Sequence, residues 1–289
     1  MRRQNINMRS DTKNIHQQKI NQAIDYINAN LHKPLALDIL ADQMCVSVRQ
    51  LLRIMRSSLN ESLSAYVSRQ RMERAVMYMQ TEKMNLTKLA EIVGYDNSQS
   101  FSKAFKKQFG ASPKAYMNEL NERLKKFVKT NDKSQNILPS EICDEDELDL
   151  VYIRIIGKYG EKDLYETAWN KLVCFLHDHQ ALSENTRFIG ISFDDPNVTR
   201  SDRCRFYACA SVQKKIAQTG AFGTIRLQKG KYAVFTLKGS YSGLQELYNN
   251  INVNFDYILR YGVAFEEYLN SPRDTRDVDL LTKIFIPIK

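Results

Sequence analysis

The sequence predicts a multidomain protein, in which an all-α domain with tandem helix-turn-helix units is followed by an α+β domain made of a duplicated βαββ unit. Three observations lead to this fold class. The chain has 289 residues, and a single hydrophobic core usually stops growing at about 250 to 300 residues. Nine of the 11 glycines come after residue 150, so the first part favours helices and the second favours turns. Each part also contains an internal repeat.

Four segments are expected along the chain. Residues 1–13 form a flexible N-terminus, because they include few large apolar side chains. Residues 14–124 form the helical domain and residues 150–289 form the α+β domain. Between them, residues 125–149 run from a Lys-rich helix end into an acidic stretch, a composition typical of an exposed linker.

The cysteines and the apolar residues indicate where the protein works. Five cysteines are scattered and form no Cys-x-x-Cys pair, as in reduced cytosolic proteins. No apolar run reaches the roughly 20 residues of a bilayer-spanning helix. We therefore expect a cytoplasmic protein with no membrane contact.

A repeat organises the helical domain. Hydrophobic spacing predicts helices at residues 15–31, 36–43, 48–58, 62–81, 86–93, 97–109 and 112–124. Residues 40–47 match residues 89–96, and each copy consists of a short helix, a tight turn and a second amphipathic helix. Ser47 and Asp96 are the predicted N-caps of the second helices. This layout is that of a helix-turn-helix.

The charge distribution indicates a polyanionic partner for the helical domain. Residues 1–130 contain 22 Lys and Arg against 11 Asp and Glu, whereas the remainder contains 20 against 22. Nucleic acid is the commonest partner of a small domain this basic. The expected partner is double-stranded DNA, although a basic surface is also found on proteins that bind no nucleic acid.

The second helix of each unit carries the candidate DNA-contacting residues. Such helices enter the major groove, where Arg and Lys pair with guanine and Gln pairs with adenine. A row of arginines at helical spacing is by itself typical of a solvated face, but two matching copies favour base recognition. The DNA-binding candidates are Arg49, Arg53, Arg56, Ser98, Gln99, Ser102, Lys103 and Lys106.

The connecting helix at 62–81 has a length that suits two grooves. Its 20 residues span about 30 Å at 1.5 Å per residue, close to the roughly 34 Å between successive major grooves. One chain could then read adjacent grooves without a partner. The same helix is equally compatible with a purely structural role in the core.

The second part repeats as well. Strand, helix, strand and strand are predicted at residues 152–157, 163–180, 187–193 and 204–212, and again at 232–238, 242–260, 264–269 and 280–288. An irregular strand at 224–227 joins the copies. Antiparallel strands with helices on one face are the expected result.

Residues 15–120 resemble the DNA-binding domain of AraC/XylS-type transcription regulators, and within them the MarA, SoxS and Rob group. The resemblance is carried by Leu40-Ala41, Arg71, Ile92-Val93-Gly94-Tyr95, residues 101–107 and residues 109–116. It implies a bacterial transcription regulator, an activator that contacts RNA polymerase, with residues 48–56 and 98–107 in consecutive major grooves. Cys45 departs from the family by replacing the usual turn glycine, and Leu52 stands where closer relatives have a polar residue.

Residues 150–289 resemble GyrI-like multidrug-sensing domains. The resemblance is carried by residues 188–191, 194–196, 207–209, 230–235, 239–241 and 265–272. It implies an apolar or cationic small-molecule effector, bound between the two repeats, and Glu266 corresponds to the family's acidic residue. A carboxylate among aromatic rings attracts an organic cation through charge and ring quadrupole. Besides Glu266, the effector-binding candidates are Tyr268, Trp169, Tyr207, Tyr159 and Phe193, aromatic residues whose spacing is also common in cores.

Two alternatives remain for the second domain, which are binding of a protein partner and hydrolysis of xenobiotics. Hydrolysis would need paired acids, but Glu266 and Glu267 are adjacent, so on a strand they face opposite ways. The four histidines form no nucleophile or metal pattern. We therefore expect no enzyme, no catalytic residue, no metal and no cofactor.

Overall fold

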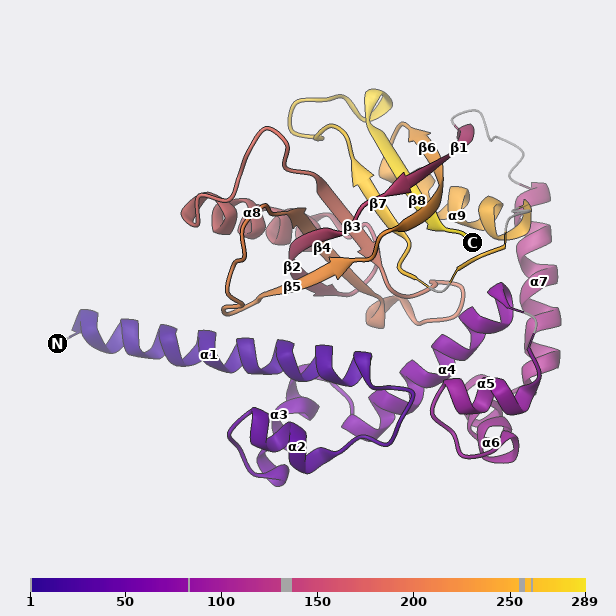
Figure 1. Ribbon diagram of the computed structural model, residues 1–289, viewed down its shortest axis with the longest axis horizontal. Coiled ribbons are helices and arrows are strands. Elements are labelled where there is room, and N and C mark those ends of the chain that lie inside the picture. Colours follow the sequence, from indigo (N-terminus) through magenta and orange to yellow (C-terminus); the bar gives the residue numbers. More distant parts are fainter. Residues whose placement is uncertain (1, 83, 131–136, 255–257, 261) are drawn as a thin grey trace. The chain divides into compact units, whose positions relative to one another are not determined.

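The computed structural model describes residues 2–82, 84–130, 137–254, 258–260 and 262–289. The chain forms two compact units, Met1–Asn118 with Gln218–Gly223, and Glu119–Ala217 with Thr224–Lys289. Figure 1 traces the helices of the first unit and the sheet of the second. No helix in the described part of the chain is both long and apolar enough to cross a membrane.

The helices of the first 130 residues follow the predicted order. They are α1 (Arg2–Ala29), α2 (Leu37–Gln43), α3 (Val48–Leu59), α4 (Leu63–Thr81), α5 (Leu86–Ile92), α6 (Ser98–Phe109) and α7 (Pro113–Thr130). The main difference is at the start, where the segment 1–13, expected to be flexible, is helical from Arg2 onward. Adding a turn to an existing helix needs no apolar face, because propagation is much easier than nucleation. The apolar pattern therefore could not reveal this extension.

Arg71 on α4 fixes the first helix-turn-helix unit relative to the second. Its Nε donates a hydrogen bond to the carbonyl oxygen of Leu31 at 2.8 Å, and its Nη2 donates to the carbonyl oxygen of Lys33 at 2.8 Å. Its guanidinium group also lies over the ring of Tyr95, 5.6 Å from the centroid. A Cβ at Gly94 would collide with the Leu31 carbonyl, so glycine allows this close approach.

The second unit is built on one eight-stranded antiparallel sheet. Its strands are β1 (Ile137–Glu145), β2 (Leu148–Ile156), β3 (Phe188–Ser192), β4 (Arg205–Ser211), β5 (Phe222–Leu227), β6 (Gly230–Lys238), β7 (Phe265–Tyr268) and β8 (Leu281–Pro287), and its helices are α8 (Lys162–Asp178) and α9 (Leu244–Asn254). The strand order is β1-β6-β8-β7-β3-β4-β2-β5. The predicted duplication is confirmed, since β2-α8-β3-β4 and β6-α9-β7-β8 are equivalent, and β3 pairs with β7 where they meet.

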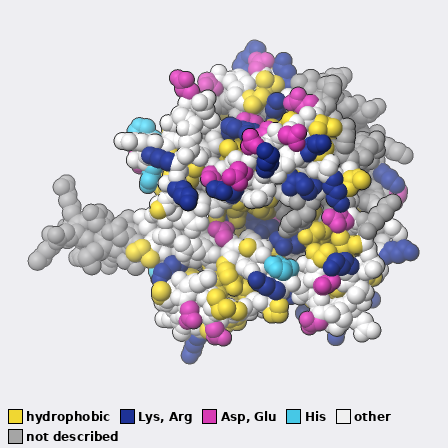
Figure 2. All heavy atoms as spheres, in the orientation of Figure 1, with side chains coloured by type: hydrophobic (Ala, Val, Ile, Leu, Met, Phe, Trp, Pro, Cys, Tyr) yellow, Lys and Arg dark blue, Asp and Glu magenta, His cyan; other side chains and the backbone are white. Residues whose placement is uncertain are grey.

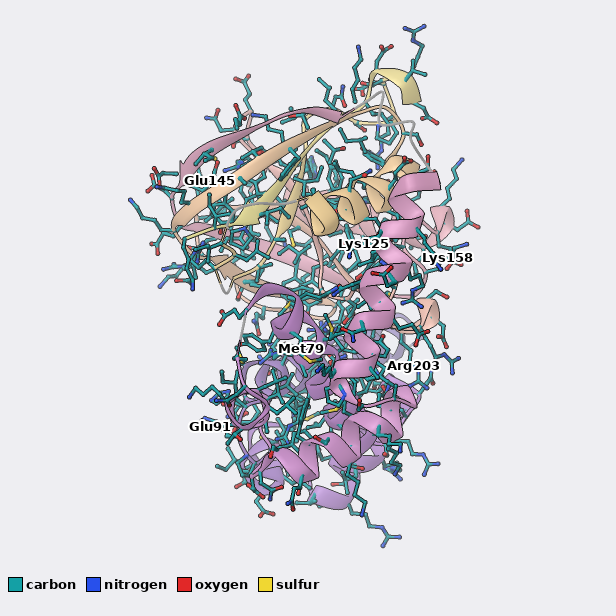
Figure 3. The ribbon with its side chains drawn as sticks, turned by 90° about the vertical axis from the view of Figure 1, so that its right-hand side faces the viewer. Met79, Glu91, Lys125, Glu145, Lys158 and Arg203 are labelled. Atoms are coloured by element: carbon teal, nitrogen blue, oxygen red, sulfur yellow. The ribbon has the colours of Figure 1, made fainter. Side chains whose placement is uncertain are left out.

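The strand that precedes each repeat lies beside the other repeat, so β1 and β5 are exchanged between the two. β1 precedes the first repeat but pairs with β6 of the second, whereas β5 precedes the second repeat but lies beside β2 of the first. The expected linker 125–149 is therefore wrong over most of its described length, because it contains the end of α7, all of β1 and the start of β2. Glu145 on β1 and Lys125 on α7 are labelled in Figure 3. β1 was missed because it is an edge strand that carries the exposed acids Glu141 and Asp144, a composition that resembles a linker.

The two faces of the sheet bury different side chains. On β8, Phe285 belongs to an aromatic cluster on one face, whereas Ile284 and Ile286 belong to the cluster under α9. On β4, Tyr207 lies on the aromatic face, and Phe206 contacts Tyr165 and Trp169 of α8 on the other. Alternation along the strands thus separates an aromatic face from a helix-covered face.

Candidate nucleic-acid interface and effector site

The turns of the two helix-turn-helix units have the same hydrogen bonds. Cys45 N donates to the Asp42 carbonyl at 2.9 Å, and Gly94 N donates to the Glu91 carbonyl at 3.0 Å. Cys45 adopts a left-handed φ of 52°, and Gly94 has a φ of 89°. The first turn therefore has the conformation of a glycine turn, with a cysteine in the left-handed region that favours glycine. The Glu91 side chain, labelled in Figure 3, lies at the surface of α5.

The helices after the turns match with a shift of 50 residues. α3 and α6 each have 12 residues and start at Val48 and Ser98. The Ser47 hydroxyl caps α3 by accepting a hydrogen bond from Gln50 N, and the Asn97 side chain caps α6 by accepting one from Ser100 N.

The predicted cap at Asp96 is wrong. Asp96 is the single residue inserted between the second turn and the cap of α6, so the equivalence of 40–47 with 89–96 ends before the cap. Aligning 89–96 with 40–47 therefore assigned the N-cap of α6 to Asp96 instead of Asn97. From the caps onward the 50-residue shift holds, and it extends to the left-handed C-cap residues Asn60 and Gly110.

Most of the predicted DNA-contacting side chains are exposed on α3 and α6. Arg49, Arg53 and Arg56 are exposed on α3, as are Gln99, Lys103 and Lys106 on α6, while Ser98 and Ser102 are half-buried. The opposite side of each helix is fully buried through Leu51 and Met55, or Phe101 and Phe105. Under the shift of 50, Arg49 corresponds to Gln99, Arg53 to Lys103 and Arg56 to Lys106.

These cations have no acidic neighbours that neutralise them. Within the described residues, no ion pair involves Arg49, Arg53, Arg56, Lys103 or Lys106, whereas Arg69 inside the unit is paired with both Glu61 and Glu73. Unpaired positive charge is therefore present on the exposed faces of both α3 and α6. Figure 2 shows the contrast on the visible face of the sheet unit, where side chains of both signs alternate.

Glu266 lies in the middle of the sheet, on the helix-covered face. It is 3% exposed. Its carboxylate accepts hydrogen bonds from the hydroxyls of Tyr268 at 2.5 Å, Tyr248 at 3.1 Å and Ser192 at 3.4 Å. No Lys, Arg or His of the described residues pairs with this carboxylate. The negative charge thus has hydroxyl donors but no counter-ion.

Burial governs the titration of this cluster. Loss of solvation raises the pKa of Glu266 above its usual 4.5, and the three hydroxyl donors oppose that rise. Burial and then the Glu266 charge raise the pKa of Tyr248 and Tyr268 well above the usual value of 10.0. The same causes raise the pKa of Tyr241 to about 12. The tyrosines therefore stay protonated and act as donors.

Two of the predicted effector-binding residues, Tyr268 and Trp169, group at Glu266. Tyr268 binds it directly, and the Trp169 ring lies edge-on to Tyr268, with centroids 5.6 Å apart. Tyr159 is on the same side of the sheet, near Phe206, but its hydroxyl is already bound between the carbonyls of Asp194 and Arg205 at 3.0 and 2.9 Å. Tyr159 thus has a structural hydrogen-bonding role in this state.

The structure does not bring Phe193 and Tyr207 to Glu266. Both belong to the aromatic face of the sheet, where their ring centroids are 4.5 Å apart and Tyr207 stacks on Tyr152. Strand alternation separates the two faces, and the strand register needed to choose between them is not visible in the sequence.

Sequence reasoning missed four residues of the cluster. Tyr248 and Ser192 bind the carboxylate, and Tyr165 and Tyr241 are close enough for its charge to affect their pKa. Tyr165 and Tyr248 lie on α8 and α9. The positions of Tyr165 and Tyr248 on the inward faces of their helices could have indicated these two residues, but only if the strand order beneath the helices had been known.

Glu267 points away from Glu266, as predicted. It accepts two hydrogen bonds of 2.8 Å from Arg187, which also donates to Glu145 on β1 at 2.8 Å. The two adjacent acids therefore lie on opposite faces of the sheet and cannot act on one bond together.

The chain thus combines two kinds of domain. One is a basic domain with tandem helix-turn-helix units, and the other is a duplicated sheet domain with a buried acid. Residues 40–119 match the helix-turn-helix domain family, and residues 138–289 match the family of GyrI-like small molecule binding domains. The chain belongs to the GyrI-like family and carries an AraC-type helix-turn-helix domain ahead of the GyrI-like domain. Both resemblances found in the sequence are thereby confirmed.

Three known proteins each resemble one part of the chain. The HTH-type transcriptional regulator AlkR of Acinetobacter baylyi is 36% identical over 98 residues, which are 34% of this chain and 32% of that protein. Regulatory protein SoxS of Salmonella typhimurium is 29% identical over 105 residues, which are 36% of this chain and 98% of that protein. The solved EcmrR C-terminal domain is 14% identical with a TM-score of 0.42, over 52% of this chain and 97% of that one. The chain spans about a third of the length of AlkR.

Proposed function

We propose that the protein is a sequence-specific DNA-binding transcription regulator, in which α3 and α6 read adjacent major grooves of double-stranded DNA. The observation that carries this proposal is the matched pair of exposed faces on α3 and α6, each cationic and unpaired. A helix held to its core on one side and bearing Arg, Lys and Gln on the other suits base edges in the major groove. The 19 residues of α4 span about 28 Å at 1.5 Å per residue, comparable with one helical repeat of DNA.

Selection of sequences from a random duplex pool tests this proposal. The full chain should enrich one sequence. Footprinting on that sequence should show two protected segments about one helical turn apart. Arg53→Ala or Gln99→Ala should each lower the preference for one base by about 1 to 3 kcal/mol. As a matched control, Arg276→Ala removes an arginine whose side chain is 82% exposed in the other unit, and it should leave the preference unchanged. Protection of only one segment would contradict the two-groove arrangement.

We also propose that the GyrI-like domain binds an organic cation at Glu266. A buried carboxylate without a counter-ion is costly, and a cation that reached it would supply the missing charge. The rings of Tyr268 and Trp169 beside it would add cation–π attraction. The resemblance of this domain to multidrug sensors agrees with an apolar or cationic effector.

Calorimetric titration with benzyltrimethylammonium tests the effector site, with neopentylbenzene as its uncharged isostere. The cation should bind more tightly than the isostere, and Glu266→Gln should weaken it about tenfold or more, as expected for a desolvated charge contact. Glu166→Gln on α8, whose side chain is 61% exposed, is the matched control and should bind normally. Equal binding of both compounds by the unaltered protein would mean that the Glu266 charge does not contribute, and binding of neither compound would favour a protein partner instead.

The proposed regulator acts as an activator that contacts RNA polymerase, which is the role that the AraC-type resemblance implies. In vitro transcription from a promoter carrying the selected sequence measures this directly. More transcript with the protein present is expected, and a decrease would identify a repressor.

A further inference from the structure

The exposed face of α3 contains one large apolar side chain among its cations. Leu52 is 40% exposed, while the other apolar side chains of α3 are buried or packed against the core of the helical unit. It lies three residues after Arg49 and four before Arg56, so it shares their side of the helix. Exposing a leucine on a face that otherwise carries cations offers no advantage to folding.

α6 has no such side chain on its corresponding face. The 50-residue shift places Leu52 at the position of Ser102, a half-buried residue with a polar hydroxyl. The flanking positions keep polar side chains in both copies, since Arg49 and Arg56 correspond to Gln99 and Lys106. The two faces therefore differ at this position in whether they offer an apolar contact.

We propose that Leu52 recognises a thymine in the DNA segment read by α3, through contact with the C5-methyl group. Thymine is the base that presents a methyl group in the major groove, where the other base edges present mainly donors and acceptors. A leucine against a polar base edge would leave that edge unpaired, whereas contact with the methyl group removes apolar surface from water.

This inference rests on the proposed DNA-binding function and adds a specificity to it. The segment under α3 contains a thymine beside the bases read by Arg49 and Arg53. The segment under α6 has no thymine read by an apolar contact at the equivalent position. The recognised sequence is therefore asymmetric, and the protein has one defined orientation on it.

Methyl deletion in the DNA tests this contact. Each thymine of the duplex selected by the full chain is replaced in turn by deoxyuridine, which removes the methyl group and keeps every donor and acceptor. One position in the α3 segment should weaken binding about fourfold, which corresponds to the 0.8 kcal/mol of one buried methylene. Deoxyuridine in the α6 segment should have no comparable effect.

Protein variants then connect that methyl group to Leu52. Leu52→Ala should bind the thymine and deoxyuridine duplexes equally well. Leu86→Ala is a matched control, because Leu86 is a similarly exposed leucine, 43% against 40%, on α5. It should keep the fourfold difference.

The outcomes separate this inference from the proposal beneath it. A selected sequence whose α3 segment shows no deoxyuridine effect would overturn the role of Leu52, and so would a Leu52→Ala protein that keeps the effect. If the unaltered protein enriched no sequence from the pool, the proposed function itself would fail, and the inference with it.

Discussion

At the scale of single residues, Glu266 combines deep burial with three hydroxyl donors and no cationic partner. The GyrI-like resemblance pointed to Glu266, and Tyr268 was added because alternation along a strand puts residues two apart on one face. It also proposed Phe193 and Tyr207, which lie on the other face, because choosing between faces requires the strand register. The resemblance thus indicated the acid, while the side chains that surround it depend on long-range strand pairing.

The raised pKa of Glu266 predicts that stability falls as pH rises. Below pH 4.5 the carboxyl is protonated in the folded and unfolded states alike. As the pH increases, the unfolded chain releases this proton first, so the folded state loses stability until its own, higher pKa is passed. Urea unfolding between pH 4 and pH 7 measures this loss.

The variant Glu266→Gln should show less of this decline than the unaltered protein. An exposed acid such as Glu166 should not contribute, so Glu166→Gln should decline as the unaltered protein does. Parallel curves for Glu266→Gln and the unaltered protein would show that the buried carboxyl is not the group responsible.

Cys45 predicts a gain in stability on substitution by glycine. A residue with a Cβ costs about 1 to 2 kcal/mol in the left-handed region, and the greater freedom of glycine in the unfolded chain returns about half of that. Cys45→Gly should therefore raise the free energy of unfolding of the helical unit by about 0.5 to 1 kcal/mol. Asn60→Gly is the control, since Asn60 has a similar φ of 54° but asparagine tolerates it better. An equal gain at both positions would contradict this reasoning.

At the scale of elements, hydrophobic periodicity gave the helices of the first unit and most strands of the second. It failed where an element lacks an apolar face, as in the first turns of α1, or where that face is small, as in β1. It also failed at the cap of α6, because one inserted residue breaks an otherwise regular repeat. Each of these failures lies where local sequence carries little of the information that fixes the element.

The corrected cap predicts different effects at two neighbouring positions. Asn97→Ala removes the side chain that accepts from Ser100 N at 2.8 Å, and it should cost about 1 kcal/mol of stability. Asp96→Ala should have little effect, because Asp96 is exposed and does not cap the helix. Thermal unfolding, monitored by circular dichroism, compares the stability of the two variants. A larger loss of stability for Asp96→Ala would indicate that Asp96 is the N-cap.

At the scale of the whole molecule, the charge difference between the two parts of the chain is the feature most directly linked to the proposed function. If the basic part makes six to ten phosphate contacts, affinity for DNA should fall about 10³- to 10⁵-fold between 50 and 200 mM salt. Fluorescence anisotropy with the selected duplex measures the slope. A change of less than tenfold would mean that few phosphates are neutralised.

The division into two parts was predictable at this scale, and so was the class of fold in each. The sheet order was not, because antiparallel pairing between strands far apart in sequence leaves no local signal. The clearest example is the exchange of β1 and β5 between the repeats, which a linear search for βαββ units cannot detect.

This exchange makes each repeat incomplete by itself. A chain cut in the connection between Ser211 and Phe222 would give two fragments, each with an edge strand that belongs beside the partner fragment. Neither fragment could form the complete sheet alone, but the two fragments mixed together should reassemble the domain by complementation. We therefore expect the two halves of the duplicated domain to fold together.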